Sequence, residues 1–155
     1  MSIQDIVIQV VSSTLASFAF SMVFHIRGIN TLISSLGGGL GWLVYCLLSY
    51  ALPSDLIRYL AAGFVISVYC ELMARIRKSP VTVFLVVAII PLVPGGGAYH
   101  TMEYLILGQS SLAASTGIHT LAIAGCIAVG IFTASSLIRL IPLMRPKYRL
   151  HKAKE

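Results

Sequence analysis

Two prolines and three consecutive glycines interrupt a long apolar run in the middle of this chain. Pro91 and Pro94 are followed at once by Gly95, Gly96 and Gly97. Proline removes a backbone donor and obstructs the preceding helical turn, and glycine has no side chain to hold a helix together. In hydrocarbon, a broken helix must be satisfied by neighbouring protein or by a water-lined cavity, which is where membrane proteins handle solutes and ions. The segment predicts a broken helix at a site of transport.

A new half-helix is expected after this break, and its residues have chemistry that suits a charged solute. Its N-terminus would offer free backbone N–H groups and the positive end of the helix dipole, both of which suit a carboxylate. Tyr99, His100 and Thr101 could add hydrogen bonds, and Glu103 could meet an amino group or take a proton. The alternative is a kinked helix that ends in an ordinary extracellular turn, with Glu103 in solvent.

A second carboxyl group, Glu71, falls inside an apolar segment on a face shared with Gly63 and Ser67. An ionisable residue in a membrane helix suggests a function, here that of a proton carrier. An equally good interpretation is an intrahelical ion pair with Arg75, four residues on.

The composition identifies an integral membrane protein. The 155 residues are 57% apolar and 10% charged, against roughly one-quarter charged residues in a soluble domain. Since one crossing takes about 20 apolar residues, we predict an all-helical bundle of five spans, the fourth of them broken, near residues 6–24, 31–51, 57–74, 80–101 and 117–138. Arg58 and Glu71 would sit at the ends of the third span, where long side chains can reach the interface.

The positive charges predict the topology of this bundle. Ten of the eleven Lys and Arg residues fall on one side of the five-span arrangement, and the other side holds Arg58 with Asp5, Asp55 and Glu103. By the positive-inside rule the N-terminus is outside and the C-terminus is cytoplasmic. Residues 1–155 are thus expected to form a single transmembrane domain with a short basic cytoplasmic tail at 142–155, which would lie against membrane lipid.

Three further small-residue patterns predict close helix contacts. A glycine cluster at 37–41 in the second span favours packing over a hinge or a second broken helix. The last span carries a ridge that should pack against another helix, and the first span has a polar face that could either line a path or pack between helices. These sets are Ala122, Cys126, Gly130 and Ala134 for the ridge, and Gln9, Ser13, Ser17, Ser21 and His25 for the polar face.

No enzyme chemistry is predicted. The four His residues are dispersed, and the three Cys residues lack metal or redox spacing. We expect no catalytic residues, metal or other cofactor, and no nucleic-acid partner. A lipid-processing enzyme would need a reactive cluster that the sequence does not contain.

At the break the sequence resembles the threonine/serine exporter (ThrE) family, specifically its small, YjjB-like membrane half. The motif comprises Ile90, Pro91, Leu92, Val93, Pro94, Gly95, Gly96, Gly97, Tyr99 and Met102, preceded by Pro80 and Phe84. The length, the span pattern and the basic tail are also similar, so the likeness extends over essentially the whole chain.

The resemblance implies a small component of a two-part secondary exporter in a bacterial plasma membrane. Its substrates would be small amino acids such as threonine and serine, or a dicarboxylate such as succinate. Its partner would be the larger ThrE-type membrane subunit, which carries a soluble portion absent here, and a homo-oligomer could also complete the path. An odd number of spans agrees, since five spans cannot divide into two equal repeats. The alternative is a non-transporting subunit that assembles or stabilises a larger transporter.

Overall fold

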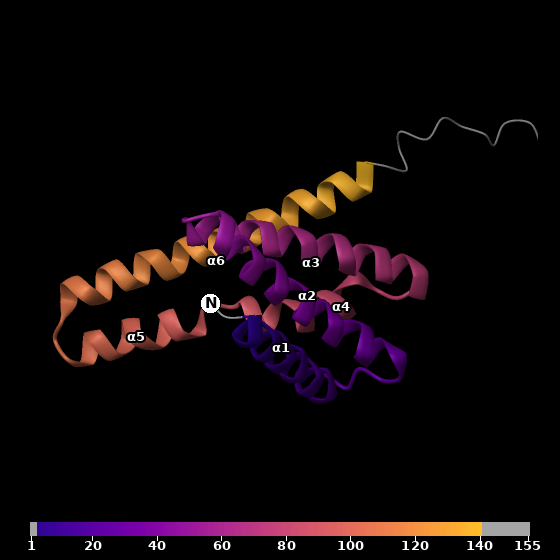
Figure 1. Ribbon diagram of the computed structural model, residues 1–155, viewed down its shortest axis with the longest axis horizontal. Coiled ribbons are helices and arrows are strands. Elements are labelled where there is room, and N and C mark those ends of the chain that lie inside the picture. The colour runs from indigo at the N-terminus through magenta and orange to yellow at the C-terminus, as the bar shows by residue number, and fades with distance from the viewer. Residues whose placement is uncertain (1–2, 141–155) are drawn as a thin grey trace, which may run out of the picture.

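The computed structural model describes residues 3–140, and this part of the chain is built from helices without a strand. Figure 1 shows their arrangement. In chain order they are α1 (Ile3–Val23), α2 (Ile29–Ala51), α3 (Asp55–Arg77), α4 (Val81–Ile89), the short 3-10 helix η1 (Ile90–Leu92), α5 (Gly95–Ile106) and α6 (Ser110–Leu140).

The predicted all-helical membrane bundle of about five spans is confirmed. Within the described residues, α1, α2, α3 and α6 are long and apolar enough to cross a membrane. A bent pair, Val81–Leu92 with Gly95–Ile106, supplies the fifth crossing if it counts as one span. The predicted tail at 142–155 lies outside the described residues.

The glycines of α2 place this helix at the centre of the bundle. A side-chain carbon added at Gly38 would overlap Ser17 of α1, and one added at Gly41 would overlap Ile66 of α3 and come within 3.3 Å of Leu92. α2 also continues without interruption from Ile29 to Ala51. The packing interpretation of the glycine cluster is therefore confirmed, and the interpretation as a second broken helix is wrong.

α6 runs alongside α3 in the same direction, at very short range. A side-chain carbon at Gly130 would overlap the Leu60 carbonyl oxygen, and one at Gly63 would lie 3.0 Å from the Ile127 carbonyl oxygen. One turn further on, the Ser67 hydroxyl donates to the Ile131 carbonyl oxygen at 3.2 Å. The predicted ridge on α6 does contact a neighbour at Gly130 and Ala134, whereas its other two members are half-buried.

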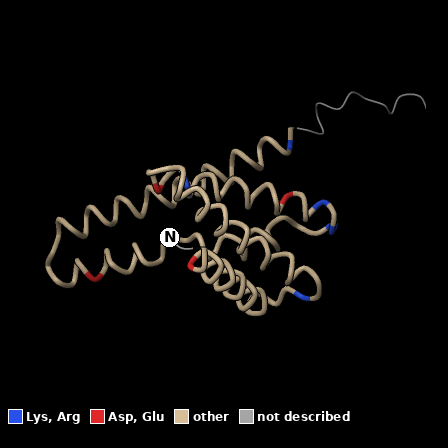
Figure 2. Tube along the Cα trace, viewed as in Figure 1, with Lys and Arg blue, Asp and Glu red and all other residues tan. Residues whose placement is uncertain are grey.

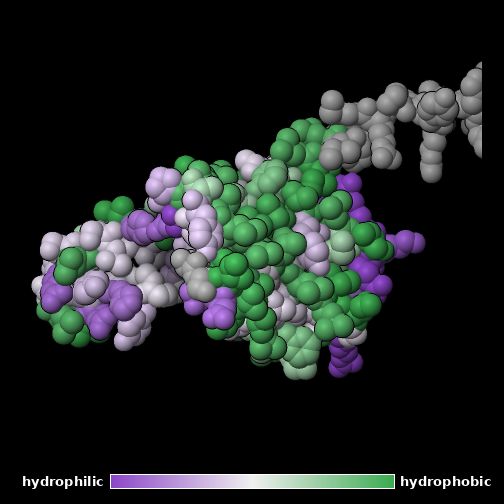
Figure 3. Space-filling model, viewed as in Figure 1, coloured by the Kyte–Doolittle hydropathy of each residue, from purple (hydrophilic) through white to green (hydrophobic). Residues whose placement is uncertain are grey.

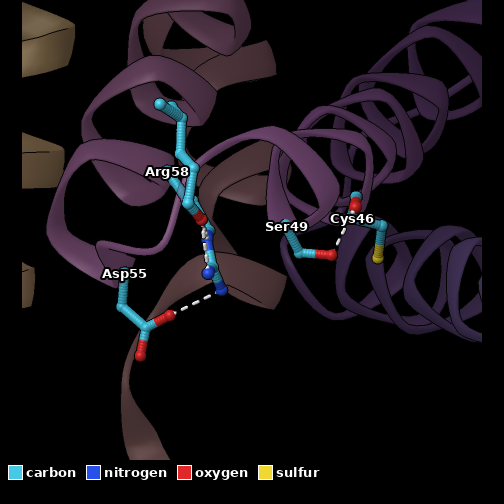
Figure 4. A network of polar contacts seen from close by, with 5 residues as sticks. Cys46, Ser49, Asp55 and Arg58 are labelled. Atoms are coloured by element: carbon cyan, nitrogen blue, oxygen red, sulfur yellow. Dashed lines mark hydrogen bonds and ion pairs between the residues drawn. The ribbon is translucent and has the colours of Figure 1, made fainter. Parts of the chain in front are cut away.

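An arginine closes the turn between α2 and α3, as Figure 4 shows. The Arg58 guanidinium donates to the Leu52 carbonyl oxygen at 2.8 and 2.5 Å and pairs with the Asp55 carboxylate at 2.7 Å. Arg58 therefore satisfies the C-terminal end of α2 instead of extending freely to the interface.

The described charges are sorted by end of the bundle (Figure 2). Figure 2 shows most of the basic residues gathered at one end, which we call the basic end. Arg27 follows α1, Arg75, Arg77 and Lys78 are at the end of α3, and Arg139 is in the last turn of α6. The opposite end carries Asp5, Asp55 and Glu103, with Arg58 paired to an acid. This is the sidedness that the five-span topology predicts.

The outer surface of the bundle is apolar, as expected of a surface that meets lipid. Figure 3 shows apolar side chains over most of the visible bundle, with polar residues gathered at its ends and on the hairpin of α5 and α6. Leu15 of α1 and Phe132 of α6, for example, are 63% and 74% exposed. An apolar area of this extent on a soluble monomer would be a liability, but in a bilayer it is simply the lipid face.

Two features of the fourth and fifth spans differ from the prediction. The break expected in the fourth span is present as a 51° turn between η1 and α5, but α5 continues to Ile106 rather than ending near residue 101. α6 begins at Ser110 rather than near 117, and its 31 residues extend over about 46 Å at 1.5 Å per residue. α5 packs along the first half of α6 and makes at most a few contacts with α1, α2 or α3, so the hairpin of α5 and α6 projects from the bundle (Figure 1).

Candidate functional site

The predicted helix break is present, and it lies at the two prolines. α4 tightens into η1 at Ile90–Leu92, Val93 is extended, and Pro94 precedes the first residue of α5. The Val93 amide donates to the Ile90 carbonyl oxygen at 3.2 Å, and the Gly95 amide donates to the Val93 carbonyl oxygen at 2.7 Å. The chain crosses the break through tight turns, because Pro91 and Pro94 cannot donate to a regular helix.

The three glycines form the first turn of α5, so the prediction that they belong to the break is wrong. The first N–H groups of a helix have no intrahelical partner. The first turn therefore accepts glycine, in spite of its weak helix propensity, more easily than the helix interior does. Their surroundings differ. A side-chain carbon at Gly97 would overlap the Thr120 hydroxyl oxygen of α6, whereas Gly95 and Gly96 have no neighbouring atom within 4 Å of such a carbon.

The polar residues of α5 point in different directions. Thr101 donates to the Gly97 carbonyl oxygen at 2.7 Å and packs toward Gly117 of α6. Tyr99 and Glu103 line an open groove of about 400 Å³ along α5 with Met102, Ile106 and Leu107. His100 Nδ1 lies 2.9 Å from Glu103 Oε2, so the structure pairs this acid with a histidine. The Glu103 side chain is nevertheless 40% exposed, as the alternative of a carboxylate in solvent expects.

Glu71 lies in another part of the molecule. It is in the last third of α3 and is 6% exposed, so it does not reach the interface as predicted. The predicted ion pair with Arg75 is also absent, because Arg75 Nη2 donates to the Ile138 carbonyl oxygen of α6 at 3.0 Å. Among the described residues, the Glu71 carboxylate has neither an ion pair nor a hydrogen bond.

The two candidate carboxylates are therefore not brought together. Glu103 is in α5, on the projecting hairpin, and Glu71 is in the last third of α3, toward the basic end. α6 contacts both of the helices that carry them, α5 with its first half and α3 with its second.

A further groove at the break escaped the sequence prediction. It measures about 360 Å³ and is lined by Ile8, Gln9, Ser12, Ser13, Ala16, Trp42 and Pro91. The four-residue repeat on α1 could be seen in the sequence, but nothing there indicated that it would meet Pro91. Ser17 and Ser21, further along the same repeat, are fully buried between helices, so the face divides into an open part and a packed part.

The family model described as Threonine/Serine exporter, ThrE, matches residues 9–137. The chain belongs to the threonine/serine exporter family. The match covers the break and all of the described helices except their first six and last three residues. Together with the apolar helices, it identifies a multi-pass membrane protein of an exporter family. Neither a curated protein nor a solved structure matches the chain.

Proposed function

We propose that the chain is the small membrane component of a two-part secondary exporter in the bacterial plasma membrane. Its substrates would be small amino acids such as threonine and serine, or a dicarboxylate such as succinate. The observation that carries this proposal is the 51° break between η1 and α5 in a chain whose family exports amino acids. Broken helices of this kind form substrate sites in secondary transporters.

The proposed substrate site is the start of α5. Gly95 and Gly96 leave the first turn without side chains and have open space around them. The N–H groups there can donate to a carboxylate in the positive field of the helix. Tyr99, His100, Thr101 and Glu103 are the groups through which α5 could hold the rest of the substrate, with Pro91, Pro94 and Gly97 fixing the position of the turn.

Glu71 is the better placed of the two proposed proton carriers. Glu71 is 6% exposed, and its carboxylate has no ion pair or hydrogen bond with another described residue, whereas Glu103 is bonded to His100 at 2.9 Å. An ionisable residue inside a membrane span is a candidate for a proton relay, and this is the role proposed for Glu71.

The two-part assembly and the topology are also proposals. Five spans do not divide into two equal inverted repeats, and α5 has no fully buried residue within this chain. Both facts support a larger ThrE-type subunit, or a second copy, beside the hairpin. The sorting of charges supports an outer N-terminus and a cytoplasmic C-terminus.

A non-transporting assembly subunit is the second candidate, and the projecting hairpin of α5 and α6 is what favours it. α5 packs on α6 and makes few contacts with the rest of the bundle, which would suit a helix that holds a neighbouring chain. In that case α5 would be a docking element, and the open glycines would have no part in export.

Efflux measurements decide between these functions. Cells would carry this chain alone, a candidate larger partner alone, or both, after loading with labelled threonine, serine or succinate. Efflux only with both chains supports the two-part exporter, and efflux with this chain alone points to a homo-oligomeric carrier. If neither chain nor the pair exports any of the three, with both proteins confirmed in the membrane, the proposal is wrong.

A further inference from the structure

The groove at the break combines residues from three elements. α1 contributes Gln9, Ser12 and Ser13, α2 contributes Trp42, and η1 contributes Pro91. Its volume of about 360 Å³ is ample for a small amino acid. None of its lining residues carries a formal charge, which distinguishes it from the groove along α5 that contains Glu103.

The break itself explains why the groove is open. η1 packs against both α1 and α2, and its residue Pro91 lines the groove. Beyond it the chain turns by 51° and follows α6. The polar face of α1 next to Trp42 is consequently left without a helix over it.

The polar groups of the groove are oriented by their own hydrogen bonds. The Gln9 side-chain oxygen accepts from Trp42 Nε1 at 3.2 Å and from the Cys46 thiol at 3.5 Å. These bonds occupy the oxygen of the Gln9 amide, and its NH2 group remains as a donor. The Ser13 hydroxyl donates to the Val10 carbonyl oxygen at 3.1 Å, so its oxygen remains as an acceptor.

An amide donor and a hydroxyl acceptor one turn apart on the same helix complement a ligand hydroxyl group. Such a group can accept from Gln9 and donate to Ser13 at the same time. A carboxylate cannot donate to Ser13 and would find no positive charge among the lining residues. An apolar side chain would leave both polar groups without a partner.

We propose that this groove, formed by Gln9 and Ser13 of α1 beside Pro91, binds the side-chain hydroxyl group of a small hydroxylated amino acid. The inference rests on the proposed function, because the ligand of the groove would be the exported amino acid.

The same face of α1 continues past the groove under Pro91. Ser17 is fully buried, and its hydroxyl has no partner among the described residues. It lies against Gly38, where an added side-chain carbon would also be 3.4 Å from Pro91 Cγ. A movement of η1 away from α2 would therefore expose a further hydroxyl in line with the groove.

Thiol labelling tests the proposed subsite without requiring transport. Ser12 is exposed in the groove, and Ser12→Cys places a thiol there. The three native cysteines are buried or half-buried, so the unsubstituted chain measures the background rate. The full chain, in membranes together with its candidate partner, would be labelled with N-ethylmaleimide in the presence of threonine or of 2-aminobutyrate, which has the same carbon skeleton without the hydroxyl group.

Threonine is expected to slow labelling at position 12, and 2-aminobutyrate is expected to protect more weakly. Adding Ser13→Ala should raise the threonine concentration needed for half-protection by about two- to tenfold, the effect of losing one uncharged hydrogen bond. Ser21→Ala is the matched control, since Ser21 belongs to the same face but lies outside the groove; it should leave protection unchanged.

The outcomes separate this inference from the exporter proposal. Equal protection by both compounds, protection by neither, or equal effects of the two alanine substitutions would each overturn the hydroxyl subsite. Threonine-selective protection that depends on Ser13 would support the subsite even if the efflux measurements showed no transport. Efflux of threonine without such protection would leave the exporter proposal standing and remove the subsite.

Discussion

The sharpest test of the proposed substrate site is the replacement of Gly96 by valine. Gly96 lies in the first turn of α5, and a side-chain carbon added there meets no atom within 4 Å. Valine is also a slightly better helix former than glycine, by a few tenths of a kcal/mol. The free energy of unfolding should therefore change by less than about 0.5 kcal/mol.

Export, in contrast, should fall strongly. The Cα–Cβ bond of a helical residue tilts toward the N-terminus of its helix, so the valine side chain would stand in front of the N–H groups that the substrate carboxylate is proposed to meet. Losing two hydrogen bonds to a charged group, at about 1.5 kcal/mol each, amounts to about 3 kcal/mol, or roughly a hundredfold in affinity.

Two matched substitutions make this result interpretable. Gly125→Val introduces the same side chain at another open glycine, in the middle of α6, and should leave export unchanged. Gly97→Val would force an overlap with Thr120 and should lower the amount of folded protein. Labelled threonine efflux at equal abundance in the membrane is the assay, and wild-type efflux from the Gly96→Val chain would refute a substrate site at this turn.

Three further predictions concern the proton carrier and the packing of the bundle. Glu71→Gln should flatten the pH dependence of efflux while Glu103→Gln preserves it, and a pH profile unchanged by Glu71→Gln would eliminate this residue as the carrier. Gly130→Val should cost about 1–3 kcal/mol through overlap with the Leu60 carbonyl oxygen; an unchanged midpoint of thermal unfolding in detergent would contradict the packing described here. Arg58→Met should cost about 1–3 kcal/mol by leaving the end of α2 unsatisfied, and the same unfolding measurement checks it.

The sequence predicted those features that depend on local chemistry. Hydropathy located α1, α2 and α3 closely, because each is a continuous apolar segment between turns. The two prolines located the break, since their effect on a helix does not depend on what surrounds them. The gathering of basic residues at one end of the bundle could also be predicted, because it follows from their positions relative to the apolar segments.

Features that depend on a distant partner could not be predicted in this way. The first turns of α6, from Ser110 to Gly117, are too polar for a membrane span but pack against α5, so the helix begins earlier than hydropathy indicates. The partner of Arg75 proved to be a carbonyl oxygen on α6 rather than the acid one turn before it. The groove beside Pro91 required knowing which face of α1 meets η1.

The length and continuity of α6 have a mechanical consequence. This single helix of 31 residues holds α5 with one half, through the Gly97–Thr120 contact, and α3 with the other, through the Gly63–Ile127 contact. Because α6 is continuous, a tilt of its first half also tilts its second half. A tilt of α5 is not passed to α4 in this way, because the helix is broken between them. A displacement of the proposed substrate turn would then reach the part of α3 that carries Glu71 through α6, and not through η1 and α4. α6 would thus couple the two ends of the molecule.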